Sequence, residues 1–254
     1  MDGPALPTPV PAVGPGGAVP IVLVHGWGGS FESTWNAAGW AKAGAALGRP
    51  VIPIDLPGHG PHPQPHDPSA YADLASGLAL ALSEQGHDLS NPVDAVGFSL
   101  GAKLLLELAC RDGARFGRLV LGGLGANAFA PERLGAELAA VLEADDETAA
   151  SAPPMLRELA RSAIDAGNDP RAVAAVLRRA PNPVLTPDRL AAVTCPVLLI
   201  AGDQDTVAQP IGRLADALSA VRSEVLPGVG HLGLPADPRF QRSALAFLTA
   251  AAHD

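Results

Sequence analysis

A serine stands between two glycines where an apolar run changes into a leucine-rich pattern. The run Val93–Val96 leads into Gly97-Phe98-Ser99-Leu100-Gly101, and leucines then recur at helical spacing up to Leu108. A strand, a G-x-S-x-G turn and a helix make up a nucleophile elbow, in which a tight turn pushes the serine hydroxyl outward. Because five residues are a short pattern, the alternative is a serine in an ordinary strand-to-helix turn. The elbow predicts that Ser99 is a nucleophile.

A serine nucleophile needs a base within hydrogen-bond reach, and the base needs a carboxylate to orient it. Candidates for both stand later in the chain, with Asp203 and Asp205 after one apolar run and His231 after the next. The C-terminal ends of parallel strands meet at one edge of a sheet, so these loops are expected to lie beside Ser99. Either aspartate could serve as the acid. Asp203 directly follows Gly202, where a short carboxylate readily bonds its own turn.

Apolar runs alternate with helical patterns along most of the chain, which predicts an α/β fold with a mostly parallel central sheet. Strands are expected at 20–24, 50–56, 93–98, 118–124, 195–201 and 223–226, and helices at 33–47, 69–85, 99–110, 210–220 and 238–251. Ser69 is the expected N-cap of the second helix.

The alternation stops between residues 127 and 192, a segment rich in Ala, Glu and Arg. Its helical patterns cover 131–143, 154–166 and 170–180, and no strand is predicted. We interpret 127–192 as a helical cap inserted into a core of 20–126 and 193–254; helices packed against the side of the sheet are the alternative. The Pro- and Gly-rich residues 1–19 are expected to form an extended arm.

The acidic composition disfavours two classes of partner. Seventeen basic residues against 26 acidic ones leave a net charge of −9, which argues against nucleic acid and against anionic membranes. Cys110 and Cys195 have no metal-binding spacing, and two buried thiols are expected rather than a disulfide. No signal peptide or membrane span is recognised, so a cytoplasmic location is expected.

Five motifs together make the chain resemble the α/β-hydrolase family: His25-Gly26-Trp27, Asp55-Leu56-Pro57-Gly58-His59-Gly60, the elbow, Gly202-Asp203-Gln204-Asp205 and Gly228-Val229-Gly230-His231. The resemblance implies an α/β-hydrolase fold with Ser99 as nucleophile, His231 as base and Asp205 as acid. It also implies an oxyanion hole formed by the backbone N–H groups of Trp27 and Leu100, and no metal or organic cofactor. Family members usually begin with two further antiparallel strands, and residues 1–19 are short for that.

The expected activity is that of a serine hydrolase that cleaves a small carboxylic ester through an acyl-enzyme on Ser99. The same residues could serve a lactonase, a thioesterase, a C–C bond hydrolase, a cofactor-free haloperoxidase or a slow-turnover ligand sensor. A small acyl compound is the expected binding partner, and the sequence predicts no particular oligomeric state.

Overall fold

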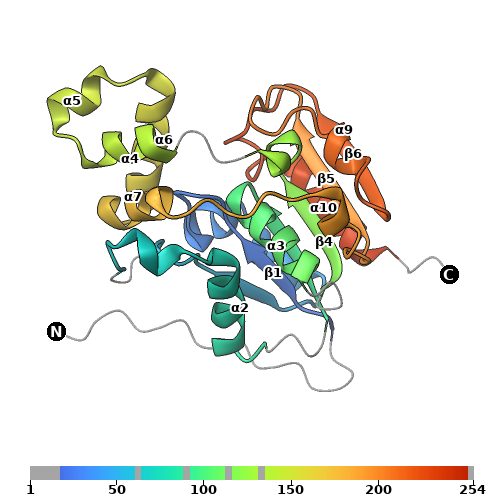
Figure 1. Ribbon diagram of the computed structural model, residues 1–254. Helices are drawn as coiled ribbons and strands as arrows, with labels where there is room; N and C mark the ends of the chain where they lie inside the picture. The colour runs from blue at the N-terminus through green and yellow to red at the C-terminus, as the bar shows by residue number, and fades with distance from the viewer. Residues whose placement is uncertain (1–17, 61–63, 88–91, 112–115, 131–134, 251–254) are drawn as a thin grey trace.

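The computed structural model describes residues 18–60, 64–87, 92–111, 116–130 and 135–250. Its centre is a six-stranded parallel sheet with the strand order β2-β1-β3-β4-β5-β6 (Figure 1). The strands are β1 (Ile21–Val24), β2 (Val51–Ile54), β3 (Val93–Phe98), β4 (Phe116–Gly122), β5 (Val197–Gly202) and β6 (Val221–Leu226). The expected fold class is confirmed. The proposed N-terminal arm falls almost entirely outside the described residues.

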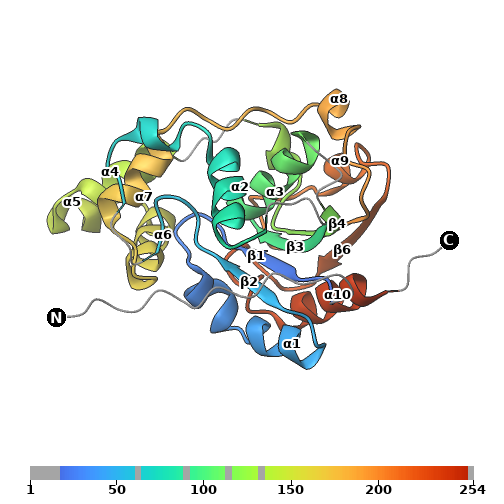
Figure 2. The same cartoon turned by 90° about the horizontal axis from the view of Figure 1, so that it is seen from below.

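Helices cover both faces of the sheet, and successive strand residues point to opposite faces. In β1, Val22 and Val24 pack into one apolar cluster, whereas Ile21 and Leu23 pack into another. Figure 2 shows α2 and α3 on one face and α1 and α10 on the other. These helices are α1 (Trp40–Ala46), α2 (Leu74–Glu84), α3 (Leu100–Arg111) and α10 (Pro238–Thr249). Burial on both faces explains why the inner strands appear in the sequence as continuous apolar runs.

The helices of residues 135–178 form a separate group beside the sheet (Figure 1). Their bounds are α4 (Gly135–Glu143), α5 (Asp146–Ser151), α6 (Pro154–Asp165) and α7 (Pro170–Arg178). An apolar cluster of their own, including Leu138, Leu156 and Val173, holds α4, α6 and α7 together. We refer to α4–α7 as the helical insertion. The sequence did not predict α5 or the short α8 (Pro187–Leu190), and the start of the pattern at 131 lies outside the described residues.

Three predicted helices differ from the observed ones. The segment 33–47 is divided by Gly39, whose φ of +80° interrupts the helix, into a π-helical turn at Glu32–Asn36 and α1. The segment 69–85 begins as a 3-10 turn, η2 (Pro68–Tyr71), and the N-cap of α2 is Asp73, which accepts a hydrogen bond from the Ser76 N–H, rather than Ser69.

The third difference is at 210–220, where the helix α9 covers only Gly212–Ala215. The chain then tightens, because the N–H groups of Ala217 and Leu218 bond to carbonyls three residues back instead of four. The following strand β6 starts two residues before the predicted position, at Val221. It is an edge strand with exposed side chains, so its apolar signal in the sequence is weak.

Candidate active site

Ser99 lies in a strained turn between β3 and α3. Its φ of +51° is the single positive value of a non-glycine residue among the residues that the structure describes. Such a conformation costs of the order of 1–3 kcal/mol and persists only where the surroundings impose it. The Ser99 N–H donates to the Gly122 carbonyl at 2.8 Å. A Cβ on Gly97 would lie 2.7 Å from the Ala102 nitrogen, so the turn requires glycine there.

The side chains of Ser99, His231 and Asp205 form one line of hydrogen bonds. Ser99 Oγ lies 2.9 Å from His231 Nε2, and His231 Nδ1 lies 2.8 Å from Asp205 Oδ2. Because a carboxylate only accepts, Nδ1 of the imidazole carries the proton, and Nε2 is left to accept the serine hydroxyl hydrogen. This arrangement can activate a serine as a nucleophile.

The surroundings of Asp205 keep its carboxylate ionised and fix its orientation. Its side chain is fully buried, and Oδ1 accepts hydrogen bonds from the N–H groups of Val207 and Ala208 at 3.0 and 2.9 Å. Burial opposes ionisation, but the hydrogen bonds from His231 and from these two backbone groups outweigh it and hold the pKa of Asp205 below its ordinary value. The carboxylate can therefore stabilise a positive charge on His231.

Asp203 has a different partner from the one the sequence suggested. Its Oδ1 accepts the Gly228 N–H at 2.7 Å and does not close its own turn. The bond joins the loop after β5 to the loop that carries His231, three residues before the imidazole. Asp203 is exposed and lies outside the Ser99–His231–Asp205 line.

The loop after β1 passes directly beside the serine. A Cβ on Gly26 would come within 3.2 Å of the Ser99 Cβ. Trp27 follows in this loop, and within the described residues its backbone N–H has no hydrogen-bond acceptor. Leu100 is the first residue of α3, where a backbone N–H has no partner within the helix. Both predicted oxyanion donors thus belong to segments that adjoin Ser99.

A cavity of about 550 Å³ lies next to this loop, between the sheet and α6. Its walls include Trp27, Phe98, Leu159 and Leu232, and exposed polar side chains of α6, among them Ser162, also line it. The imidazole of His231 packs on Phe98 with ring centroids 4.9 Å apart. The cavity can hold a small molecule with an apolar part.

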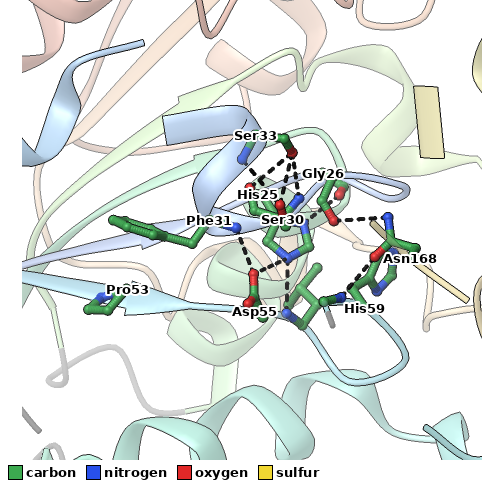
Figure 3. A network of polar contacts seen from close by, with 12 residues as sticks. His25, Gly26, Ser30, Phe31, Ser33, Pro53, Asp55, His59 and Asn168 are labelled. Carbon is green, nitrogen blue, oxygen red and sulfur yellow. Dashed lines mark hydrogen bonds and ion pairs between the residues drawn. The ribbon is translucent and has the colours of Figure 1, made fainter. Parts of the chain in front are cut away.

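A second polar cluster lies behind the loop and contains two buried histidines (Figure 3). His25 donates from Nδ1 to the Gly26 carbonyl at 2.7 Å and accepts the Leu56 N–H at Nε2. His59 accepts the Gly28 N–H at Nε2, 3.0 Å away, and its Nδ1 faces the Pro57 carbonyl. Burial and the neighbouring His25 lower the pKa of His59 to about 3, so the ring is neutral.

Sequence reasoning missed two residues that reach the loop from elsewhere. Asn168, in the turn between α6 and α7, bonds to the Gly28 carbonyl, and the Trp27 indole Nε1 donates to the Val173 carbonyl of α7. In the sequence, Gly167-Asn168-Asp169-Pro170 is typical of a turn before a helix, and Asp169 does cap α7. No local signal distinguishes Asn168 from an ordinary turn residue.

The described residues contain no group of three His, Cys, Asp or Glu side chains placed to hold a metal ion. Within the same ranges, no helix has both the length and the apolarity that a membrane crossing requires. Cys110 and Cys195 are both free; Cys195 is buried as expected, whereas Cys110 is only half-buried.

The family model described as "Alpha/beta hydrolase family" matches residues 21–242. The chain therefore belongs to the α/β-hydrolase family, and the expected resemblance is confirmed. A hydrolase from Pseudomonas aeruginosa PA01 has a similar structure, with a TM-score of 0.70, 26% identity and coverage of 92% of this chain and 91% of that one. The enol-lactonase from Burkholderia xenovorans LB400 aligns with a TM-score of 0.71 at 24% identity, covering 92% and 93% of the two chains.

A curated relative, the pimeloyl-[acyl-carrier protein] methyl ester esterase of a Neisseria meningitidis serogroup C strain, is 33% identical over 103 residues. This match covers 36% of the present chain and spans less than a third of the relative, 31% of its length. The corresponding protein of a serogroup A strain matches at the same identity over 25% of its length.

Proposed function

We propose that the protein is a serine hydrolase that cleaves a small carboxylic ester by acyl transfer. The observation that carries the proposal is the line from Ser99 Oγ through His231 to Asp205, with distances of 2.9 and 2.8 Å. Family membership and the methyl ester esterase named among the relatives support an ester as substrate.

In the proposed reaction, Ser99 Oγ attacks the ester carbonyl carbon while its proton passes to His231 Nε2. The carbonyl oxygen becomes an oxyanion, which the Trp27 and Leu100 N–H groups stabilise. Collapse of this intermediate breaks the bond to the alcohol oxygen, which takes the proton from His231 and leaves. Water then repeats the cycle on the acyl-enzyme, giving the acid and free Ser99. Asp205 keeps the imidazole in the productive tautomer and stabilises it when it is charged.

The helical insertion is proposed to act as a cap that forms one wall of the substrate cavity. Leu159 and other side chains of α6 face the cavity of about 550 Å³, a volume suited to a small ester and not to a macromolecule. A cytoplasmic location is part of the same proposal, and the two free cysteines support it, because reducing compartments keep thiols unpaired.

The test is covalent labelling with a fluorophosphonate probe, together with turnover of short-chain, methyl, lactone and thioester substrates. Wild type should carry the probe on Ser99, located by peptide mass spectrometry, and Ser99→Ala should lose both labelling and turnover. In a protease triad, loss of the nucleophile costs about 10⁶ in turnover. Ser162→Ala is a matched control, since Ser162 is an exposed serine of α6 that lines the cavity, whereas His231 bonds to Ser99. Labelling without turnover of any acyl substrate would favour the ligand sensor instead.

A further inference from the structure

Three successive peptide groups of the loop after β1 are each held by a side chain, that of His25, His59 or Asn168. Figure 3 labels these three residues together with Gly26. His25 Nδ1 donates to the carbonyl of the Gly26–Trp27 peptide at 2.7 Å. His59 Nε2 accepts the N–H of the Trp27–Gly28 peptide at 3.0 Å. Asn168 Nδ2 donates to the carbonyl of the Gly28–Gly29 peptide at 2.8 Å. The first of these peptides carries the Trp27 N–H.

Fixing one side of a peptide group fixes the other, because the group is planar. The hydrogen bond from His25 to the Gly26 carbonyl therefore sets the direction of the Trp27 N–H on the opposite edge of the same plane. The next two peptides limit how far that plane can rotate, since rotation at Trp27 or Gly28 would break the bonds to His59 or Asn168. The Gly26 carbonyl also accepts the Gly29 N–H at 3.1 Å, so the orientation of this donor depends on the three side-chain bonds together with this backbone bond.

Asn168 is the member of the set that belongs to the helical insertion. Its side chain is 6% exposed and uses both ends of the amide: Oδ1 accepts the Gly60 N–H at 2.8 Å, and Nδ2 also donates to the Ala163 carbonyl at 2.8 Å. The partners determine which end is oxygen, because Gly60 supplies a donor and the two carbonyls require one. Asn168 therefore ties α6 to two loops of the core.

Two further contacts join the helical insertion to the same loop. The indole of Trp27 donates to the Val173 carbonyl of α7 at 3.1 Å. A Cβ on Gly28 would lie 3.1 Å from the Ala163 Cβ, so α6 packs closely on the Gly28 backbone. The segment 26–29 is thus clamped between the sheet and the helical insertion.

We infer that Asn168 is a positioning residue for the oxyanion donor of Trp27, so that the oxyanion hole is complete only when α6 and α7 are docked on the core. The inference rests on the proposed serine hydrolase function. It assigns the helical insertion a role in the chemical step in addition to shaping the cavity. Asn168 acts through the loop backbone, and its loss should weaken binding of the transition state more than binding of the substrate.

The decisive variant is Asn168→Asp, which has nearly the same shape. It keeps the acceptor for the Gly60 N–H but loses the amino group and places a carboxylate oxygen beside the Gly28 and Ala163 carbonyls. We expect kcat to fall about 10- to 100-fold, the range expected when a reacting group is displaced by up to 1 Å. KM should change by a smaller factor, because an oxyanion donor binds the transition state more strongly than the substrate.

The matched control is His66→Ala. His66 Nε2 pairs with Asp169 Oδ2 at 2.6 Å, so this variant breaks a core-to-insertion contact one residue from Asn168 without touching the loop. The expected kcat and KM are those of wild type. A loss equal to that of Asn168→Asp would show that general loosening of the junction, and not the bond to Gly28, causes the effect, and would overturn the inference.

An aryl trifluoromethyl ketone gives a readout that a merely structural role would not change. Ser99 Oγ adds to its carbonyl carbon, the proton passes to His231, and the resulting oxyanion occupies the oxyanion hole. The inhibition constant of Asn168→Asp should rise by the same factor by which kcat/KM falls. An unchanged inhibition constant, with Ser99→Ala inactive as proposed, would overturn the inference and leave the proposed function standing.

Hydrogen–deuterium exchange tests the clamp without turnover. In Asn168→Asp, exchange of the peptide that covers 26–30 should become at least about tenfold faster, while peptides of β3 and β5 remain protected. If wild type hydrolyses no ester, the proposed function fails, and this exchange result still decides whether Asn168 holds the loop. Unchanged exchange would refute the clamp.

If Asn168→Asp exchanges quickly throughout and is therefore unfolded, Trp27→Phe tests the same docking. It removes the indole bond to Val173 and keeps the Trp27 backbone N–H. It should lower kcat and ketone affinity in parallel by about three- to tenfold, the effect of one neutral hydrogen bond. Wild-type values for both would overturn the inference.

Discussion

The neutral imidazole of His59 should make the stability of the fold fall as the solution becomes acidic. Burial and the neighbouring His25 lower the pKa of His59 from 6.5 to about 3. Between these values the unfolded chain binds a proton at this position and the folded chain does not. Proton binding then favours the unfolded state. His59 therefore does not affect the free energy of unfolding above pH 6.5 and lowers it progressively as the pH falls towards 3.

The size of the effect follows from the two pKa values. Each pH unit below 6.5 costs about 1.4 kcal/mol of unfolding free energy, so His59 should cost about 2 kcal/mol at pH 5.0 and almost nothing at pH 7.5. His25 adds to the effect with the same sign, because burial lowers its pKa as well. Aspartates with a lowered pKa, such as Asp205, lose their contribution to stability only when the pH falls below the pKa of the unfolded chain, which is near 3.8 and outside this range.

The assay is urea unfolding between pH 5.0 and 7.5 for wild type and His59→Gln. A glutamine oxygen can still accept the Gly28 N–H but does not titrate, so the variant should lose about 2 kcal/mol less than wild type between pH 7.5 and 5.0. Ile200→Val, in the core of β5, should lower stability by about 0.5–1.5 kcal/mol equally at every pH. Parallel curves for wild type and His59→Gln would refute the reasoning.

Two other substitutions and one titration make further predictions. Asp205→Asn should present an N–H to His231 Nδ1, reverse the tautomer and lower turnover by about 10⁴, as in a protease triad. Asp203→Asn should keep turnover within about tenfold and lower the free energy of unfolding by about 1 kcal/mol, because its bond to the Gly228 N–H is weakened. Steady-state kinetics and urea unfolding measure both effects, and an active Asp205→Asn with an inactive Asp203→Asn would contradict the assignment. Burial raises the pKa of Cys110 and of Cys195 to about 11. Both thiols should therefore react slowly with a disulfide reagent at pH 8 in the folded protein and at once after unfolding. Rapid reaction of the folded protein would contradict this prediction.

The sequence alone was enough to predict the sheet and its family because both are encoded locally. A strand buried on both faces requires an apolar run, as in Ile21–Val24 and Val197–Gly202, and the elbow requires glycine wherever a Cβ would collide with backbone, as at Gly97. The same reasoning is weak where burial is weak. The edge strand β6 and the short helix α9 were predicted with wrong bounds, since few of their side chains face a core. The inner strand β4 also differs, at 116–122 instead of the predicted 118–124.

The proposed site residues were identified from the sequence because each follows a strand and has a chemically specific type. Two carboxylates, Asp203 and Asp205, met that description. Only the tertiary structure distinguishes them: Asp203 bonds to the Gly228 backbone, and Asp205 bonds to the imidazole of His231. The difference depends on how the loops after β5 and β6 approach each other, which the spacing of residues along the chain does not specify.

Asn168 could be found only in three dimensions. It stands 140 residues from the Gly28 carbonyl that it binds, and a side-chain amide bonded to backbone groups leaves no mark on residue type or spacing at the other end. Hydrophobic burial repeats with the period of a helix or strand, so it can be recognised in a sequence. A hydrogen bond to a distant peptide group has no such pattern, because it forms only when the two segments pack together. For this reason the chemistry was predicted from the motifs, and the link between the helical insertion and the loop after β1 was visible only in the packed fold.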